Sequence, residues 1–188
     1  MQMRGLFFFR RMLRLPLAVM VLAALAGSQP ARADFAQLRI LPESELRFGT
    51  FAVMDNGYRV VRPDGSVQSV GIFSTSSSDT GPARFRIRYD RGNNGKRRLD
   101  LKIELRFAAV PVVTQGGLIV QLTQYQTDLP GYSNVTAGQA VEINIPNCTQ
   151  RVCEMTFNLG GRLDVERNYG GGTVTLAIPV DAVLISVK

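Results

Sequence analysis

The sequence lacks the residue type on which most hydrolytic and metal sites depend. It contains no histidine among its 188 residues. Because histidine is the commonest general base near neutral pH and a frequent metal ligand, its absence excludes catalytic triads, dyads and zinc sites of the usual kinds. Carboxylate pairs such as Asp100 with Glu104 remain, but the solvated face of a strand produces the same spacing. We therefore expect a protein that is not an enzyme, with no catalytic residue, no metal site and no cofactor.

Cysteine is nearly absent as well. The only two are Cys148 and Cys153, separated by five positions. In an oxidising compartment such a pair forms a disulfide by default. The alternative, a redox-active pair, usually needs tighter spacing at a helix N-terminus. We expect a disulfide that closes a local turn between two strands.

No apolar run in the sequence is long enough to cross a bilayer. The longest candidate, residues 15–27, is 13 residues long, against the roughly 20 that a membrane-spanning helix needs. It follows a basic stretch and precedes Ala31-Arg32-Ala33, which is the layout of an export signal. We expect a signal peptide over residues 1–33, cleaved after Ala33, and a mature domain over residues 34–188. The mature chain would then reach the periplasm, the cell surface or the medium without an integral membrane span.

The excess of positive charge lies largely in this signal segment. Residues 1–33 hold five of the 22 basic residues and none of the 15 acidic ones, which leaves a net charge of +2 on residues 34–188. Export and this modest charge argue against a nucleic-acid partner. The remaining positive charge is concentrated in residues 84–106, with nine basic and three acidic side chains.

This basic segment has two interpretations. It could dock an anionic glycan or envelope surface, or it could be a solvated strand face whose arginines pair with Asp100 and Glu104 across a hairpin. The candidate docking residues are Arg84, Arg86, Arg88, Arg97, Arg98 and Lys102.

Alternation with a period of two dominates the mature chain. Residues 99–107 alternate apolar and charged side chains, residues 84–89 do the same, and the turn-rich segment 91–96 lies between them, so we predict a hairpin. A second hairpin is predicted over residues 58–70, with a turn at Arg62-Pro63-Asp64-Gly65.

We interpret residues 74–78 as a polar loop. Further strands are expected at residues 46–53, 118–122, 141–145, 155–159 and 173–187, and no helix is expected outside the signal segment. The pattern predicts one all-β domain, an antiparallel sandwich or barrel.

Three stretches resemble a known family. They are residues 46–51 (LRFGTF), residues 63–67 (PDGSV) followed by residues 83–87 (ARFRI), and residues 160–165 (GGRLDV) before a Tyr-Gly turn and an alternating last strand. In this order they are similar to the exported bacterial domains known as domain of unknown function 4402, which look like pilin and spore-coat subunits. The resemblance implies an immunoglobulin-like, pilin-like β-sandwich with a surface or appendage role and no catalytic residues.

Two functions of different classes follow from these observations. The first is a structural or adhesive subunit that associates by strand addition with copies of itself or related subunits and a periplasmic chaperone. Residues 34–41 could be the donated strand, with Ala36, Leu38 and Ile40 on one face, although the same residues could simply pair in their own sheet. The second is a stand-alone binding module that uses the basic hairpin.

Overall fold

The described part of the protein is built from antiparallel strands. The computed structural model describes residues 37–115, 117–167 and 171–188, which belong to one unit, Asp34–Lys188. These residues form strands and no helix, which confirms the all-β antiparallel prediction. The predicted signal peptide and Ala36 lie outside the described residues. No helix of the described ranges has the length and apolarity to cross a membrane.

The strands fall into two sheets. The larger contains β1 (Gln37–Ser44), β2 (Leu46–Val61), β3 (Val67–Gly81), β4 (Ala83–Asp90), β6 (Val113–Gln115), β7 (Leu118–Thr127), β8 (Asn134–Val135), β10 (Val152–Arg167) and β11 (Gly171–Leu176). The smaller has the order β12-β5-β9, with β5 (Leu99–Phe107), β9 (Ala140–Cys148) and β12 (Val180–Val187).

The first four strands form one long antiparallel ribbon. β2 pairs with β3 from the turn outward, beginning with Val61 opposite Val67. β1, which precedes β2 in the chain, pairs with β4, which follows β3. Gln37 lies opposite Asp90 at the end of the ribbon away from the turn. The predicted hairpin over residues 58–70 is therefore confirmed, and its turn places Gly65 at a φ of 84°, which glycine adopts without strain.

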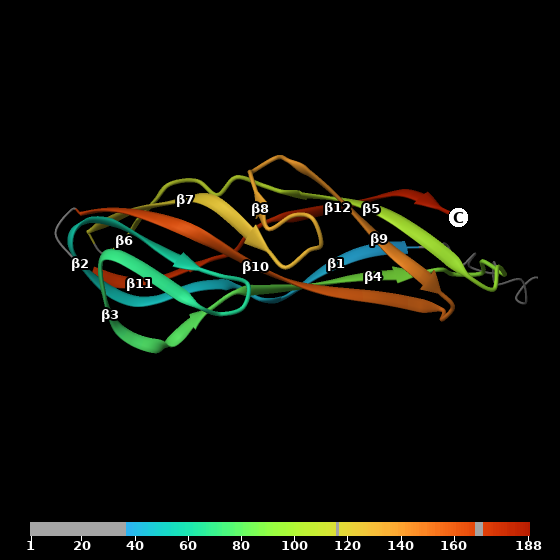
Figure 1. The fold of residues 1–188 in the computed structure, drawn as a ribbon, viewed down its shortest axis with the longest axis horizontal. Coiled ribbons are helices and arrows are strands. Elements are labelled where there is room, and N and C mark those ends of the chain that lie inside the picture. Colours follow the sequence, from blue (N-terminus) through green and yellow to red (C-terminus); the bar gives the residue numbers. More distant parts are fainter. Residues whose placement is uncertain (1–36, 116, 168–170) are drawn as a thin grey trace, which may run out of the picture. The chain divides into compact units, whose positions relative to one another are not determined.

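β10 connects the two halves of the larger sheet. Its first half, from Val152 to Leu159, pairs with β4, and its second half pairs with β2 and β7 on opposite edges. Figure 1 shows β10 passing from the group of β1, β4, β5, β9 and β12 to the group of β2, β3, β6, β7 and β11. Gly160 lies at the junction, where a Cβ atom would come within 2.1 Å of the Val61 carbonyl oxygen.

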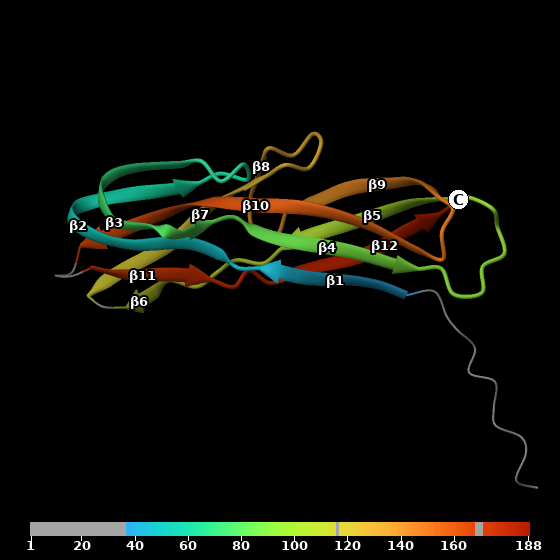
Figure 2. The same cartoon turned by 90° about the horizontal axis from the view of Figure 1, so that it is seen from below.

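The smaller sheet packs on the first half of the larger one. Along β5 the apolar side chains are buried, as the alternation predicts, and Phe107 meets Phe157 of β10 edge to face, with ring centroids 6.1 Å apart. Figure 2 shows β5, β9 and β12 behind β1, β4 and the first half of β10. The Cys148–Cys153 disulfide joins the end of β9 to the start of β10, and so links the two sheets.

Three local predictions are wrong. The strand expected over residues 173–187 is two strands, β11 and β12, which belong to different sheets. β4 and β5 do not form a hairpin, because β4 pairs with β1 and β10 while β5 pairs with β9 and β12. The chain between them crosses from one sheet to the other around the buried Arg91, whose guanidinium donates to the carbonyls of Asn94, Lys96 and Thr149. Residues 74–78 are not a loop but part of β3.

Candidate functional site

The predicted donor residues lie on an edge strand of the protein's own sheet. Leu38 and Ile40 on β1 are half-buried and pack against the core. In this single chain β1 pairs with β4, and no described strand pairs with its other edge.

The predicted basic surface is divided between the two sheets. Arg84, Arg86 and Arg88 lie on the outward face of β4, since the residues between them are buried. Their carboxylate partners come from the neighbouring strands: Glu43 of β1 lies 3.1 Å from Arg84, and Glu154 of β10 lies 3.2 Å from Arg86. Glu43 also pairs with Arg86.

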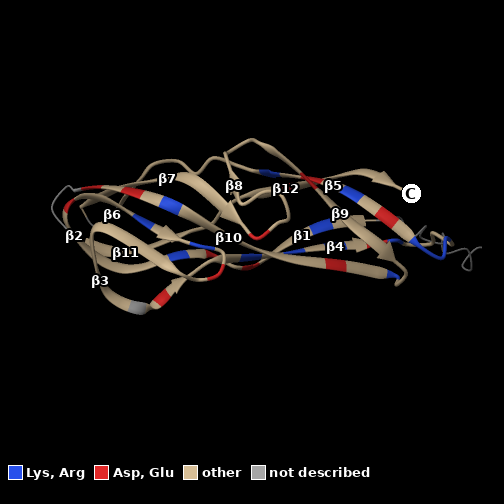
Figure 3. Cartoon of the chain, viewed as in Figure 1, with Lys and Arg blue, Asp and Glu red and all other residues tan. Residues whose placement is uncertain are grey.

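The other basic candidates belong to the smaller sheet and the loop before it. Lys102 projects from the outward face of β5, where its Nζ lies 2.6 Å from a Glu142 carboxylate oxygen of β9. Arg98 lies 3.6 Å from Asp100, and Arg97 is exposed in the loop. Figure 3 shows basic and acidic residues interspersed along β5 and β10. The six residues are therefore not gathered on one face, because the two outward faces point away from the shared core.

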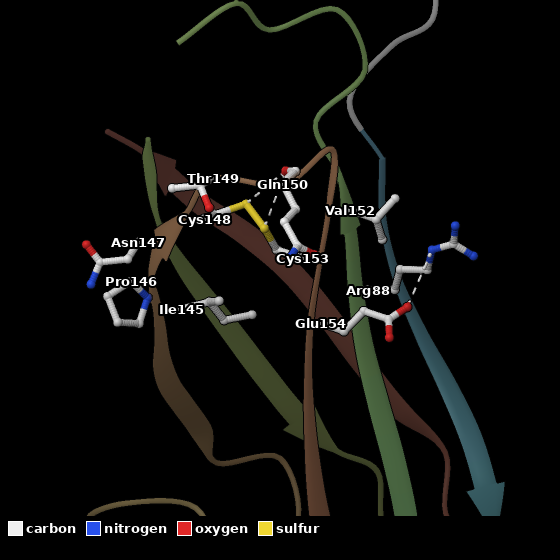
Figure 4. Close-up of a pocket in the computed structure, with 10 residues that line it drawn as sticks. All are labelled: Arg88, Ile145, Pro146, Asn147, Cys148, Thr149, Gln150, Val152, Cys153 and Glu154. Atoms are coloured by element: carbon white, nitrogen blue, oxygen red, sulfur yellow. Dashed lines mark hydrogen bonds and ion pairs between the residues drawn. A yellow bond between two sulfur atoms is a disulfide. The ribbon is translucent and has the colours of Figure 1, made fainter. Parts of the chain in front are cut away.

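An open pocket lies on one side of the molecule, where β9 and β10 separate. It has a volume of about 650 Å³, and Cys148 and Cys153 are among its lining residues. Figure 4 shows Ile145, Pro146 and Asn147 of β9 on one side of the opening, with the disulfide at its closed end. Glu154 of β10 lies on the other side.

The backbone of β10 beside this pocket has an open edge. Asn158 directs its N–H to the Asp128 carboxylate (2.8 Å) and its carbonyl to the Asp128 N–H (3.4 Å), so its peptide groups point away from β4. Because these directions repeat every second residue along a strand, the peptide groups of Glu154 and Thr156 also point outward. No described strand pairs with this edge between Val152 and Asn158.

The facing edge of β9 is covered only in part. The N–H of Glu142 donates to the Tyr132 hydroxyl at 3.3 Å. By the same alternation the peptide groups of Asn144, two residues further along β9, also point away from β5, and Tyr132 does not cover them. The open side is thus bordered by two unpaired edges, one from each sheet.

A second site, which was not among the predictions from the sequence, is centred on Arg59 of β2. This arginine is only 3% exposed. Its guanidinium donates to the hydroxyls of Ser69 (3.2 Å), Ser74 (3.4 Å) and Thr80 (3.3 Å), all on β3. Burial lowers the pKa of the Arg59 guanidinium, because desolvation disfavours the charged form. The signal was available in the alternation of the hairpin, which places Arg59 on the same face as the buried Val61.

Arg59 lines a second open pocket of about 560 Å³. Ser69, Ser74 and Thr80 line it as well, and Ile72 and Phe73 add apolar surface. Among the described residues that line this pocket, Arg59 is the only charged one. In the part of the chain that the structure describes, no group of three or more acidic or cysteine side chains is arranged to hold a metal ion.

Comparison with known proteins gives one match. The family model described as "Domain of unknown function (DUF4402)" matches residues 38–183. No curated protein and no solved structure matches the chain significantly.

Proposed function

The chain belongs to the DUF4402 family, and from its geometry we propose that it is an exported structural or adhesive subunit that assembles by strand addition. In this proposal the mature chain is a non-enzymatic, immunoglobulin-like sandwich of the pilin kind, released by cleavage after Ala33 into the periplasm or onto the cell surface. Its partners are other copies or related subunits, delivered with the help of a periplasmic chaperone.

One observation carries the proposal: the open edge of β10 beside the pocket between the two sheets. An extended segment of another subunit can pair with the outward peptide groups of Glu154 and Thr156, because main-chain hydrogen bonds supply the affinity in strand addition. Its alternate side chains would enter the pocket next to Ile145, where they gain apolar contact and fix the register.

The test is to block this edge without disturbing the pairing with β4. Thr156→Pro removes the outward N–H, and proline is tolerated at a sheet edge because no internal hydrogen bond is lost there. We expect Thr156→Pro to remain a folded monomer by circular dichroism and light scattering, while the unmodified protein forms oligomers. Thr156→Val is the matched control, since it changes the same side chain, retains the N–H and should assemble normally. A protein that stays monomeric at high concentration, or a proline variant that assembles as well as the control, would contradict the proposal.

A separate experiment identifies the donated segment. In the single chain β1 pairs with β4, so donation of residues 34–41 requires this strand to leave its own sheet. A variant without residues 34–42 that stays folded but no longer assembles would identify β1 as the donor. A variant that unfolds would show that β1 belongs to its own sheet.

The export part of the proposal has a direct test. Intact-mass spectrometry of the protein recovered from the envelope should give a chain that begins at Asp34. Recovery of the uncleaved chain from the cytoplasm would contradict the proposal that the protein is exported.

A further inference from the structure

Arg59 is an unusual buried cation, because its partners are neutral. Its guanidinium donates hydrogen bonds to three side-chain hydroxyls, at 3.2 to 3.4 Å, the long end of the normal range. In the described part of the chain Arg59 forms no ion pair with a carboxylate. Its Nε atom is buried and has no hydrogen-bond partner. A buried charge is costly unless it is paired, so this arrangement leaves a cation that an anion would stabilise.

The guanidinium borders a pocket that a ligand can enter. Ser69, Ser74 and Thr80, which accept its hydrogen bonds, also line the pocket of about 560 Å³. A guanidinium has five N–H donors, and three are engaged by these hydroxyls. The two unused protons are on Nε and Nη1, and because the Nε atom is buried, the Nη1 proton is the one that remains for a ligand.

The lining indicates which anion fits. Arg59 is the only charged lining residue, and a single positive charge suits a monoanion better than a doubly charged phosphate. A carboxylate can accept the remaining Nη1 proton in a charge-assisted hydrogen bond. Beside these polar groups lie two apolar residues, the buried Ile72 and Phe73, which is 60% exposed. The carboxylate should therefore be attached to an apolar group.

We propose that the Arg59 pocket between β2 and β3 binds an organic monocarboxylate, with the carboxylate on the Arg59 guanidinium and its apolar substituent against Ile72 and Phe73. The hydroxyls of Ser69, Ser74 and Thr80 hold the guanidinium in place. Those of Ser69 and Thr80 can also donate to the carboxylate, whereas the Ser74 hydroxyl donates to the Ser76 carbonyl. This site lies on a different part of the larger sheet from the open edge of β10, and does not depend on assembly.

The test is an NMR titration of ¹⁵N-labelled protein with phenylacetate and with its neutral counterpart phenylacetamide. We expect phenylacetate to shift the amide signals of Ser69, Ser74 and Thr80 and the Nε–H signal of Arg59, and phenylacetamide to bind at least about tenfold more weakly, because a hydrogen bond to a charged group is lost. The absence of shifts at these residues up to about 10 mM phenylacetate, a range that reveals even millimolar affinity, would overturn the proposal. Equal binding of phenylacetamide would overturn it as well.

A matched pair of variants separates the pocket from general positive charge. Arg59→Met should weaken phenylacetate binding about tenfold or more. Arg62→Met removes the same charge three residues away, where the guanidinium bonds to Gln68 Oε1 (2.9 Å) outside the pocket, and should bind normally. If Arg59→Met does not fold, Ser74→Ala serves instead and should weaken binding roughly fivefold, because the Arg59 guanidinium loses one of the hydroxyls that orient it. The proposal would be contradicted if Arg59→Met or Ser74→Ala bound phenylacetate as tightly as the unmodified protein, or if Arg62→Met lost binding.

The source of the carboxylate is resolved with a second probe. N-acetyl-L-phenylalanine presents the same groups as the carboxyl end of a peptide. Tighter binding of this probe than of phenylacetate would assign the site to a peptide carboxyl terminus, and weaker binding to a free organic acid. Both results require a carboxylate on Arg59.

Discussion

Two arginines are buried in the described residues, and their partners differ. Arg91 is 6% exposed and donates to the carbonyl oxygens of Asn94, Lys96 and Thr149. These carbonyls belong to two chain segments that cross between the sheets, so Arg91 holds the crossing together. Arg59 is buried to a similar degree, but it bonds only to hydroxyls, which can rotate to bond to one another or to water.

This difference predicts opposite consequences for stability. Arg91→Met should lower the free energy of unfolding by about 2–3 kcal/mol, because three hydrogen bonds from a buried charged donor are lost. Arg59→Met should change it by less than about 1 kcal/mol, because the lost hydrogen bonds are offset by removal of a desolvated charge. Urea denaturation of both variants measures the difference. A larger loss for Arg59→Met than for Arg91→Met would make Arg59 a structural residue.

At the scale of the strands, the alternation of side chains predicted which face of each strand is buried, but not which strands pair with one another. The buried set on β5 and the outward set on β4 follow directly from period two. Their assignment to one hairpin failed, because side-chain alternation shows which residues face a core and not which strand lies alongside. The polar residues of β3 have no apolar alternation, so only the pairing with β2 reveals them as a strand. The Arg59 site was missed for a related reason: its partners lie up to 21 positions away along β3.

The junction in β10 depends on the absence of a side chain at Gly160. A Cβ atom there would lie 2.1 Å from the Val61 carbonyl oxygen, a backbone atom that cannot move aside by rotating. Gly160→Ala should therefore cost roughly 1–3 kcal/mol of stability through overpacking. Gly172→Ala on β11 is the matched control, because no atom lies within 4 Å of its Cβ position, and it should change stability by less than about 0.5 kcal/mol. Thermal denaturation compares the two, and equal melting temperatures would contradict this account of Gly160.

The disulfide joins β9 to β10, which belong to different sheets, and does not connect the two strands of a hairpin. Its separation of five positions closes a small loop, for which the chain-entropy model gives a stabilisation of about 2 kcal/mol. A Cys148→Ala/Cys153→Ala variant should thus lose about 2 kcal/mol in urea denaturation and keep its β-sheet circular dichroism spectrum. Loss of the folded spectrum would show that the bond is required for the two sheets to pack.

At the scale of the whole molecule, the placement of charge argues against a single basic docking face. The net charge of +2 on residues 34–188 follows from the sequence once the predicted signal segment is removed. The division of the basic residues between two sheets does not follow from the sequence, because it depends on how the chain around Arg91 passes from β4 in one sheet to β5 in the other. Arg88 and Lys102, for example, lie on opposite outward faces, and each has a carboxylate within 4 Å.

These two residues form a matched pair for testing the binding-module alternative. Their side chains are exposed to similar extents, 45% for Arg88 and 40% for Lys102, and each substitution by glutamine removes one positive charge. Because exposed ion pairs contribute little and are screened by salt, neither change should unfold the protein. We expect Arg88→Gln and Lys102→Gln to lower by similar amounts the salt concentration at which the protein elutes from a sulfonated column, and the double variant to show the sum. If one substitution alone abolishes retention, the protein carries a one-sided basic surface that docks anionic partners, and the binding-module function regains its basis.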